Sequence, residues 1–163
     1  MILKTTTIAG VIILGVILLF NDFDTPTKPV QPENLNTFIE KQSIQNPNII
    51  RVSDSKYYLF SDETDTIYVY EGNGNSHTSP GVPRDGIIFG GREVGSFGLI
   101  IRNNDILQNA SYYKLIIDGE SKTYDYNRDR YVVVQDNRIW NPVPQVTIEF
   151  LNTHKKTLLK QTF

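Results

Sequence analysis

Hydrophobic and polar residues alternate along most of the chain after residue 48. Near the C-terminus, Val146, Ile148 and Phe150 share one face of an extended segment, and Thr147 and Glu149 share the other. A two-residue period is typical of a β-sheet with one buried face and one face in water. The pattern predicts ten strands, at residues 49–53, 56–60, 66–70, 86–89, 96–102, 112–117, 122–126, 130–135, 145–151 and 157–163.

Two pairs of these strands are separated by sequences that favour tight turns. Asp118-Gly119 is a typical two-residue hairpin turn, and a second turn is expected between Asn152 and Lys155. Many short strands in a stretch of roughly 115 residues are typical of an immunoglobulin-like two-sheet sandwich. We therefore predict an all-β fold, an immunoglobulin-like β-sandwich over residues 48–163, with a small barrel as the alternative.

The first 21 residues follow a different pattern. No polar side chain occurs between Ile8 and Phe20. The longer uncharged stretch from Thr5 to Asn21 would form a helix roughly 25 Å long, against a hydrocarbon core of about 30 Å. This predicts a transmembrane anchor at residues 1–21, with a cleaved signal peptide as the alternative. Lys4 precedes the run and Asp22 follows it, which favours a cytoplasmic N-terminus and an extracytoplasmic C-terminal domain.

Residues 22–47 are predicted to link the anchor to the β domain. Three prolines at three-residue spacing, between residues 24 and 33, favour a short extended spacer. Thr37 and Glu40 have the spacing of a helix capping box, which predicts one short helix after the spacer. An irregular linker is the alternative interpretation of the same residues.

This order of parts resembles that of archaeal pilin-like and archaellum-stator surface proteins. The features that carry the resemblance are the apolar anchor, the proline-bearing stalk and the closing hairpin VTIEFLNTHKKTLLKQTF. The resemblance implies a membrane-anchored, immunoglobulin-like surface protein. Lys4-Thr5 does not supply the processing site of a pilin-type signal, and the prolines interrupt the long N-terminal helix on which filament assembly would depend.

Charge and cysteine content exclude several classes of function. The formal net charge is −2, and the 16 lysines and arginines are scattered, so the chain lacks the basic surface that neutralises nucleic-acid phosphates. We expect no nucleic-acid partner. With no cysteine, disulfides, thiolate metal sites and a thiol nucleophile are impossible.

No convincing catalytic or metal-binding motif is present. Ser76 and Ser79 flank His77 in a glycine-rich stretch, without the sequence context of a nucleophile motif. The best match to a calcium loop, in DYNRDRYVVVQD, has Arg130 where glycine is required, and Asp62, Glu63 and Asp65 favour a solvated turn. We predict no enzyme activity, no cofactor and no metal.

Aromatic residues leave a further possibility open. Nine tyrosines lie in or beside the predicted strands, where an exposed row could stack on sugars or anchor a protein. Tyrosine is also simply a good strand former. Trp140 is interpreted as a plug that closes one end of the sandwich core.

The segment EGNGNSHTSPGVPRDG, residues 71–86, is the longest predicted connection between strands. Connections beyond roughly 12 to 15 residues tend to be functional or disordered. We predict a partner-contact loop with Asn75, His77, Arg84 and Asp85 as its specificity-determining residues; a mobile solvent loop is the alternative.

The sequence as a whole favours a membrane-tethered, extracytoplasmic, non-enzymatic binding module at the cell surface. Its partner would be a protein or an envelope component. One alternative is a subunit or accessory protein of a pilin-like filament, which requires self-association. Another is a small cell-surface hydrolase or sugar-binding protein.

Overall fold

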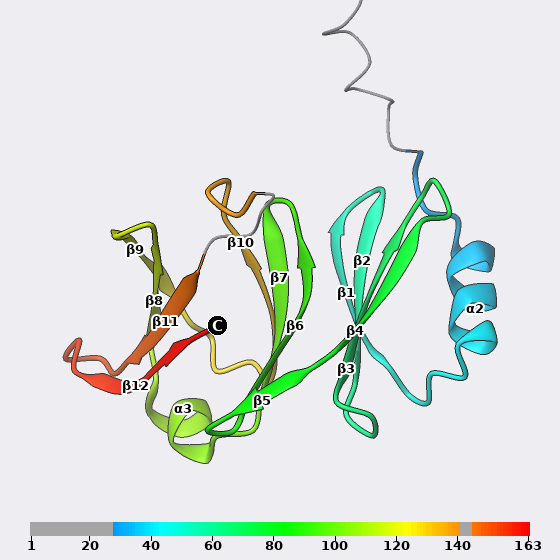
Figure 1. Cartoon of the computed structure of the whole chain (residues 1–163). Coiled ribbons are helices and arrows are strands. Elements are labelled where there is room, and N and C mark those ends of the chain that lie inside the picture. The colour runs from blue at the N-terminus through cyan, green and yellow to red at the C-terminus, as the bar shows by residue number, and fades with distance from the viewer. Residues whose placement is uncertain (1–27, 141–144) are drawn as a thin grey trace, which may run out of the picture.

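The computed structural model describes residues 28–140 and 145–163, which form three four-stranded antiparallel sheets and two helices (Figure 1). The N-terminal sheet has the order β1-β2-β3-β4, with β1 (Asn48–Ser53), β2 (Lys56–Ser61), β3 (Thr66–Glu71) and β4 (Ser76–Pro80). The central sheet has the order β10-β7-β6-β5, with β5 (Val82–Arg84), β6 (Ile87–Glu93), β7 (Ser96–Ile101) and β10 (Tyr131–Gln135). The C-terminal sheet has the order β12-β11-β8-β9, with β8 (Tyr112–Ile117), β9 (Glu120–Asp125), β11 (Val146–Leu151) and β12 (Thr157–Thr162).

The three sheets are stacked in layers, with the central sheet covered on both faces (Figure 1). Ile88 and Ile100 face the N-terminal sheet, and Phe97 and Leu99 belong to the core shared with the C-terminal sheet. Every residue of β7 is therefore buried. A strand covered on both faces must be apolar at consecutive positions, which explains the unbroken sequence SFGLII.

The all-β prediction is confirmed, and each of the ten predicted strands is present within a few residues of its expected bounds. The predicted number of sheets is wrong, because the chain builds three where a sandwich has two. Strand periodicity shows which strands have a buried face but not how many sheets share them. The apolar runs of β6 and β7 carried the signal of a third layer.

Helix α2 (Pro32–Lys41) packs against the outer face of the N-terminal sheet (Figure 1). It begins five residues before the predicted cap, with Pro32 in its first turn, where a missing N–H costs nothing. Thr37 lies inside the helix, and its hydroxyl donates to the Glu33 carbonyl (2.8 Å). Leu35 and Phe38 are buried against the sheet, so the segment predicted as a linker contributes a packed layer to the fold.

The predicted anchor at residues 1–21 lies outside the described residues. Among the residues that the structure describes, no helix is long and apolar enough to cross a membrane.

The short helix α3 (Asn104–Asn109) connects the central sheet to the C-terminal sheet and was not predicted. The Asn103 side chain caps it by accepting hydrogen bonds from the backbone N–H groups of Asp105 and Ile106. At six residues it has a single buried side chain, Ile106, too few positions to display a helical period.

Candidate binding site

Residues 71–86, predicted to form a long loop, form a hairpin turn followed by two consecutive strands. The turn at residues 71–75 leads into β4, which is an edge of the N-terminal sheet; Gly81 then separates it from β5, an edge of the central sheet. This segment crosses from one layer to the next (Figure 1). The loop prediction is therefore wrong, because most of the segment forms two strands, one in each of two sheets.

The prolines that suggested a loop lie where an edge strand tolerates them. The Glu71 N–H donates to the Asn75 carbonyl (2.9 Å), and the Gly81 N–H donates to the Asp65 carbonyl (2.8 Å). Because inward and outward backbone positions alternate along an antiparallel strand, Pro80 falls at an outward position of β4. Proline there removes a donor from the free edge and none from the ladder.

The four predicted contact residues separate into two groups. Asn75 lies at the hairpin turn, and the Nδ1 atom of His77 is 2.5 Å from an Oε1 atom of Glu93. Both line one cavity of about 230 Å³. Arg84 and Asp85 lie at the other end of the segment and contact β12: the Arg84 guanidinium donates to the Thr162 carbonyl (2.7 Å), and Gln161 donates to the Asp85 carboxylate.

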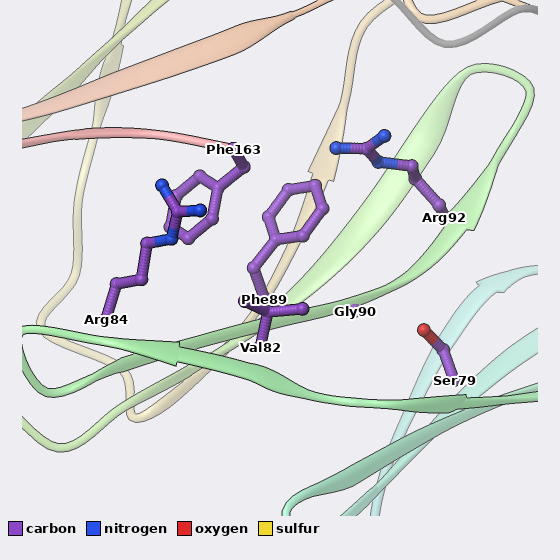
Figure 2. Close-up of a pocket in the computed structure, with 7 residues that line it drawn as sticks. All are labelled: Ser79, Val82, Arg84, Phe89, Gly90, Arg92 and Phe163. Carbon is purple, nitrogen blue, oxygen red and sulfur yellow. The ribbon is translucent and has the colours of Figure 1, made fainter.

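A second cavity, of about 260 Å³, opens where the edge of the central sheet meets the end of β12 (Figure 2). It is lined by Ser79, Val82, Arg84, Phe89, Gly90, Arg92 and Phe163. The rings of Phe89 and Phe163 stack with their centroids 4.4 Å apart and their planes 10° apart. The ring centroids of Phe89 and Phe97 are 4.7 Å apart, so the aromatic floor of this cavity is continuous with the core between the central and C-terminal sheets.

Two arginines flank the stacked rings, Arg84 beside Phe163 and Arg92 beside Phe89 (Figure 2). The Arg92 guanidinium carbon lies 4.8 Å from the centre of the Phe89 ring. The Arg92 Nε atom is buried without a hydrogen-bond partner among the described residues, and burial lowers the pKa of this side chain. Among the described residues, no carboxylate forms an ion pair with Arg84 or Arg92.

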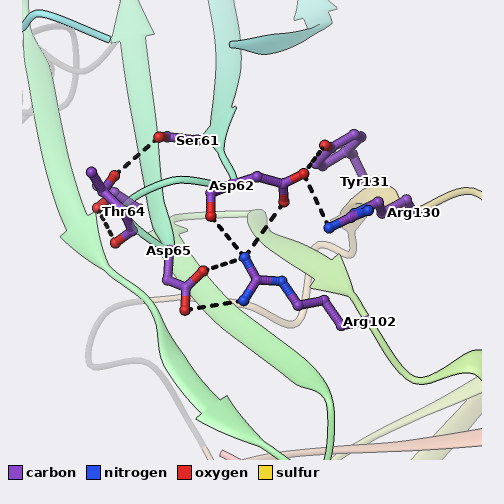
Figure 3. Close-up of polar contacts among 8 residues, drawn as sticks. Ser61, Asp62, Thr64, Asp65, Arg102, Arg130 and Tyr131 are labelled. Atoms are coloured by element: carbon purple, nitrogen blue, oxygen red, sulfur yellow. Dashed lines mark hydrogen bonds and ion pairs between the residues drawn. The ribbon is translucent and has the colours of Figure 1, made fainter. Parts of the chain in front are cut away.

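The acidic turn between β2 and β3 is partly in water, as the sequence predicts, with Glu63 exposed and Asp62 and Asp65 half-exposed, but both aspartates are also paired. Asp62 accepts a hydrogen bond from the Tyr131 hydroxyl (2.6 Å) and pairs with Arg130 (3.1 Å). Asp65 pairs with Arg102 at 2.5 Å (Figure 3). Because the aspartates belong to the N-terminal sheet side and their partners to the central sheet side, this network connects two layers and has a structural role.

A second charged cluster closes one corner of the C-terminal sheet. The Asp136 side chain is fully buried, accepts hydrogen bonds from the Arg138 guanidinium (2.7 and 2.9 Å) and accepts one from the Tyr124 hydroxyl (2.6 Å). The Arg138 hydrogen bonds hold the pKa of this carboxyl well below its ordinary range. Asp136 was the twelfth position of the calcium-loop match, and its contacts are those of a structural ion pair.

Neither the aromatic row nor the tryptophan plug is formed. All nine tyrosines are buried or half-buried, so they offer no exposed stacking row. Trp140, predicted to close the core, is 53% exposed, and the apolar residue beside it, Ile139, is fully buried in its place.

In the described part of the chain, the residues considered for a nucleophile motif or a metal site are not brought together. His77 pairs with Glu93, and no hydrogen bond of the described residues joins it to Ser76 or Ser79. No group of three or more potential ligands that could hold a metal ion occurs in residues 28–140 and 145–163.

Of the cavity residues, Arg84 was identified from the sequence, and the aromatic pair and Arg92 were not. Phe89 and Phe163 looked like ordinary strand residues, and Arg92 follows Gly90-Gly91 in β6. Nothing in the sequence signals that residues so far apart in the chain meet. Comparisons of the chain with protein-family models, with curated proteins and with solved structures find no match.

Proposed function

We propose that this protein is a membrane-tethered, extracytoplasmic binding module that recognises a protein or envelope partner through the cavity flanked by Arg84 and Arg92. The observation that carries the proposal is that two arginines without carboxylate partners in the described chain border a stacked aromatic pair. Arg84 is exposed and Arg92 is half-buried, and a charged group partly removed from water, as Arg92 is, is costly unless a partner compensates it. A ligand supplies that partner.

The N-terminal sequence supports the tether. The uncharged stretch from Thr5 to Asn21 would form a helix roughly 25 Å long, close to the thickness of a hydrocarbon core, and its flanking charges favour an extracytoplasmic domain. The resemblance in layout to archaeal pilin-like and archaellum-stator surface proteins agrees with this orientation.

Strand order supports an immunoglobulin-like sandwich within the fold. In immunoglobulin-type domains strands A, B and E share one sheet, and C, F and G share the other. Here β6, β7 and β10 are neighbours in the central sheet, and β8, β11 and β12 are neighbours in the C-terminal sheet. They follow one another along the chain in the order A, B, C, E, F, G, with β9 beside β8 in the place of C′. On this interpretation β1–β4 form an added layer.

Cysteine labelling tests the topology, because the chain contains no cysteine of its own. Ser121 is exposed on β9, and Thr5 precedes the apolar stretch. In intact cells we expect a membrane-impermeant maleimide to label Ser121→Cys, and to label Thr5→Cys only after permeabilisation. Labelling of Ser121→Cys only after permeabilisation would contradict the proposed orientation.

Crosslinking from the rim of the cavity tests the binding function. Val82 is 47% exposed and lines the cavity, so Val82→Cys carrying a benzophenone maleimide should crosslink in membranes to one partner of fixed mass. Ser121→Cys, on another sheet, is the matched control and should not yield that band. A ladder in steps of 18.6 kDa would favour a self-associating filament subunit instead, and no product specific to Val82 would count against the proposal.

A further inference from the structure

The cavity between the edge of the central sheet and the end of β12 combines positive charge with an aromatic floor. We propose that it binds a carboxylate and an adjacent aromatic or similarly flat apolar group, presented by a segment of a protein partner in which an acidic residue neighbours an aromatic one. This inference deepens the binding function proposed above and rests on it.

The arginines determine the charge of the ligand. A guanidinium has five N–H donors in a planar fork that fits a carboxylate. Arg84 uses one donor in its recorded hydrogen bond, to the Thr162 carbonyl (2.7 Å). Within the part of the chain that the structure describes, no side-chain hydrogen bond of Arg92 is present, and its Nε atom is buried without a partner. An arriving carboxylate therefore gains charge-assisted hydrogen bonds from donors that other side chains have not claimed.

The rings determine the shape of the apolar part of the ligand. Phe89 and Phe163 are nearly parallel, 10° apart, and Val82 at the rim is about half exposed. A planar group can lie against such a surface in an offset-stacked or edge-on arrangement. The volume of about 260 Å³ is below the range of roughly 300–1,000 Å³ typical of drug-sized ligands, so it suits one ring with one carboxylate.

A carboxylate fits this setting better than a phosphate. The apolar side chains that border the arginines make the cavity a poor environment for a dianion, because the cost of removing charge from water rises steeply with charge. The formal net charge of −2 also disfavours a polyanionic partner such as nucleic acid.

The edge strand beside the cavity does not favour a partner that adds a strand. Pro80 occupies an outward position of β4, and Pro83 lies in β5 directly beside the cavity-lining residues Val82 and Arg84. Proline has no N–H to donate to an added strand. Recognition is therefore expected to depend on a side chain seated in the cavity.

Ligand-observed NMR with simple probes tests this chemistry. The full-length chain in detergent is titrated with 3-phenylpropionate, with its neutral amide and with phenyl phosphate. We expect saturable binding of the carboxylate, at least tenfold weaker binding of the amide, and weaker binding of the phosphate. Loss of one charge-assisted hydrogen bond weakens binding by about tenfold or more.

Variants locate the binding to the cavity. Arg92→Gln retains much of the side-chain length without the charge and should weaken carboxylate binding about tenfold while leaving amide binding unchanged. Arg51→Gln is the matched control, because Arg51 is exposed on β1 and pairs with Asp54. It should bind like the wild type and also reports any partition of the probe into detergent micelles.

The outcomes separate this inference from the proposed function. Equal binding of acid and amide, tighter binding of the phosphate, or wild-type carboxylate affinity in Arg92→Gln would overturn the carboxylate assignment, and a retained Val82 crosslink would then leave the binding module standing. Selective carboxylate binding without any Val82 crosslink would overturn the protein-partner part of the inference and the proposed function together, and would indicate a small-molecule site.

Discussion

The two faces of the central sheet are built differently. Toward the C-terminal sheet it contributes to an apolar cluster with fifteen buried residues among those described, which includes Phe97 and Phe150. Toward the N-terminal sheet the cluster has six, and one of them is Tyr58, whose hydroxyl is hydrogen-bonded. Because each fully buried large apolar side chain contributes roughly 1.5–3 kcal/mol, the first interface is expected to stabilise the fold and the second to attach a separate layer.

The second interface also contains polar contacts, whose role is to align the two layers. The Tyr58 hydroxyl bonds to the Gly91 carbonyl (2.9 Å) and to the Ser96 hydroxyl (2.8 Å), and Asp65 pairs with Arg102 across the layers (Figure 3). Such contacts add little net free energy but penalise misalignment, because a displaced group is left unsatisfied. We therefore expect polar contacts to align the N-terminal sheet on the central sheet, and the apolar cluster between the central and C-terminal sheets to supply most of the stability.

The largest loss of stability is expected from a cavity in the core between the central and C-terminal sheets. Phe97 is fully buried between the central and C-terminal sheets, so Phe97→Ala should lower the free energy of unfolding by about 4 kcal/mol. Chemical denaturation of the full-length chain in detergent, followed by circular dichroism, measures this change in the free energy of unfolding. A loss below about 1 kcal/mol would show that this interface does not carry the stability.

Low pH should lower the free energy of unfolding through protonation of the Asp136 carboxylate. Its carboxyl pKa is depressed in the fold, mainly by hydrogen bonds from Arg138. The stability it contributes is therefore complete above about pH 4, the ordinary carboxyl pKa, and is lost as the pH falls toward the folded value. Asp136→Asn should cost about 3 kcal/mol at neutral pH and flatten the decline in stability between pH 5 and pH 2.

Asp125→Asn is the control for this pH series, because Asp125 is exposed on β9. It should reproduce the wild-type acid profile. An unchanged acid profile in Asp136→Asn would remove the carboxyl from the account of acid stability.

A smaller, local effect is expected from crowding the second interface. A Cβ atom on Gly98 would lie 2.9 Å from the Ile67 Cγ2 atom and 3.0 Å from the Phe60 Cε1 atom, both on the N-terminal sheet. Gly98→Ala should destabilise the protein by about 2 kcal/mol. In an Ile67→Ala background the added cost should shrink, because the crowded methyl group is gone; a full additive cost would place the strain elsewhere.

The smallest loss of stability is expected from removing a polar contact at the second interface, and it tests most directly whether the two interfaces differ. Tyr58→Phe removes the hydroxyl that contacts Gly91 and Ser96, at a cost of about 1–2 kcal/mol. Hydrogen exchange followed by mass spectrometry should show faster exchange in β1–β4 and unchanged exchange in β7, β8 and β11. Uniform acceleration in all three sheets would mean that the layers unfold as one unit.

Strands with one or two buried faces could be predicted because burial imposes a pattern on their residues. Apolar residues alternate with polar ones when one face is buried and run consecutively when both are. The hairpins at Asp118-Gly119 and after Asn152 were predictable from turn chemistry, and both form: Asp118 and Gly119 have positive φ values of 50° and 80°, and the Asn152 N–H donates to the Lys156 carbonyl. The edge strands β4 and β5 were missed because prolines, small residues and exposed side chains predict a loop whenever the neighbouring strand is unknown.

The residues of the candidate site also fall into those that the sequence could identify and those that it could not. Arg84 was identified because it belongs to a conspicuous segment, and Arg92 was not, since its significance lies in the absence of a carboxylate partner among the described residues. Phe163 reaches the cavity because the β11–β12 hairpin brings the end of the chain to Val146, with which Phe163 exchanges backbone hydrogen bonds. Contacts between residues 70 positions apart leave no periodic trace in a sequence.

The sequence by itself determined the β class, most of the strands, two turns and an apolar N-terminal stretch, because these depend on local conformational preference and on a period that one strand displays alone. Only the tertiary structure decided that the strands stack in three layers, that residues 76–84 join two sheet edges, and that Arg84, Arg92 and two phenylalanines share a cavity. The buried faces of different sheets look alike in sequence, so the sequence does not show which sheets pack against each other. That arrangement is determined by the free energy of packing between segments that are distant in the chain.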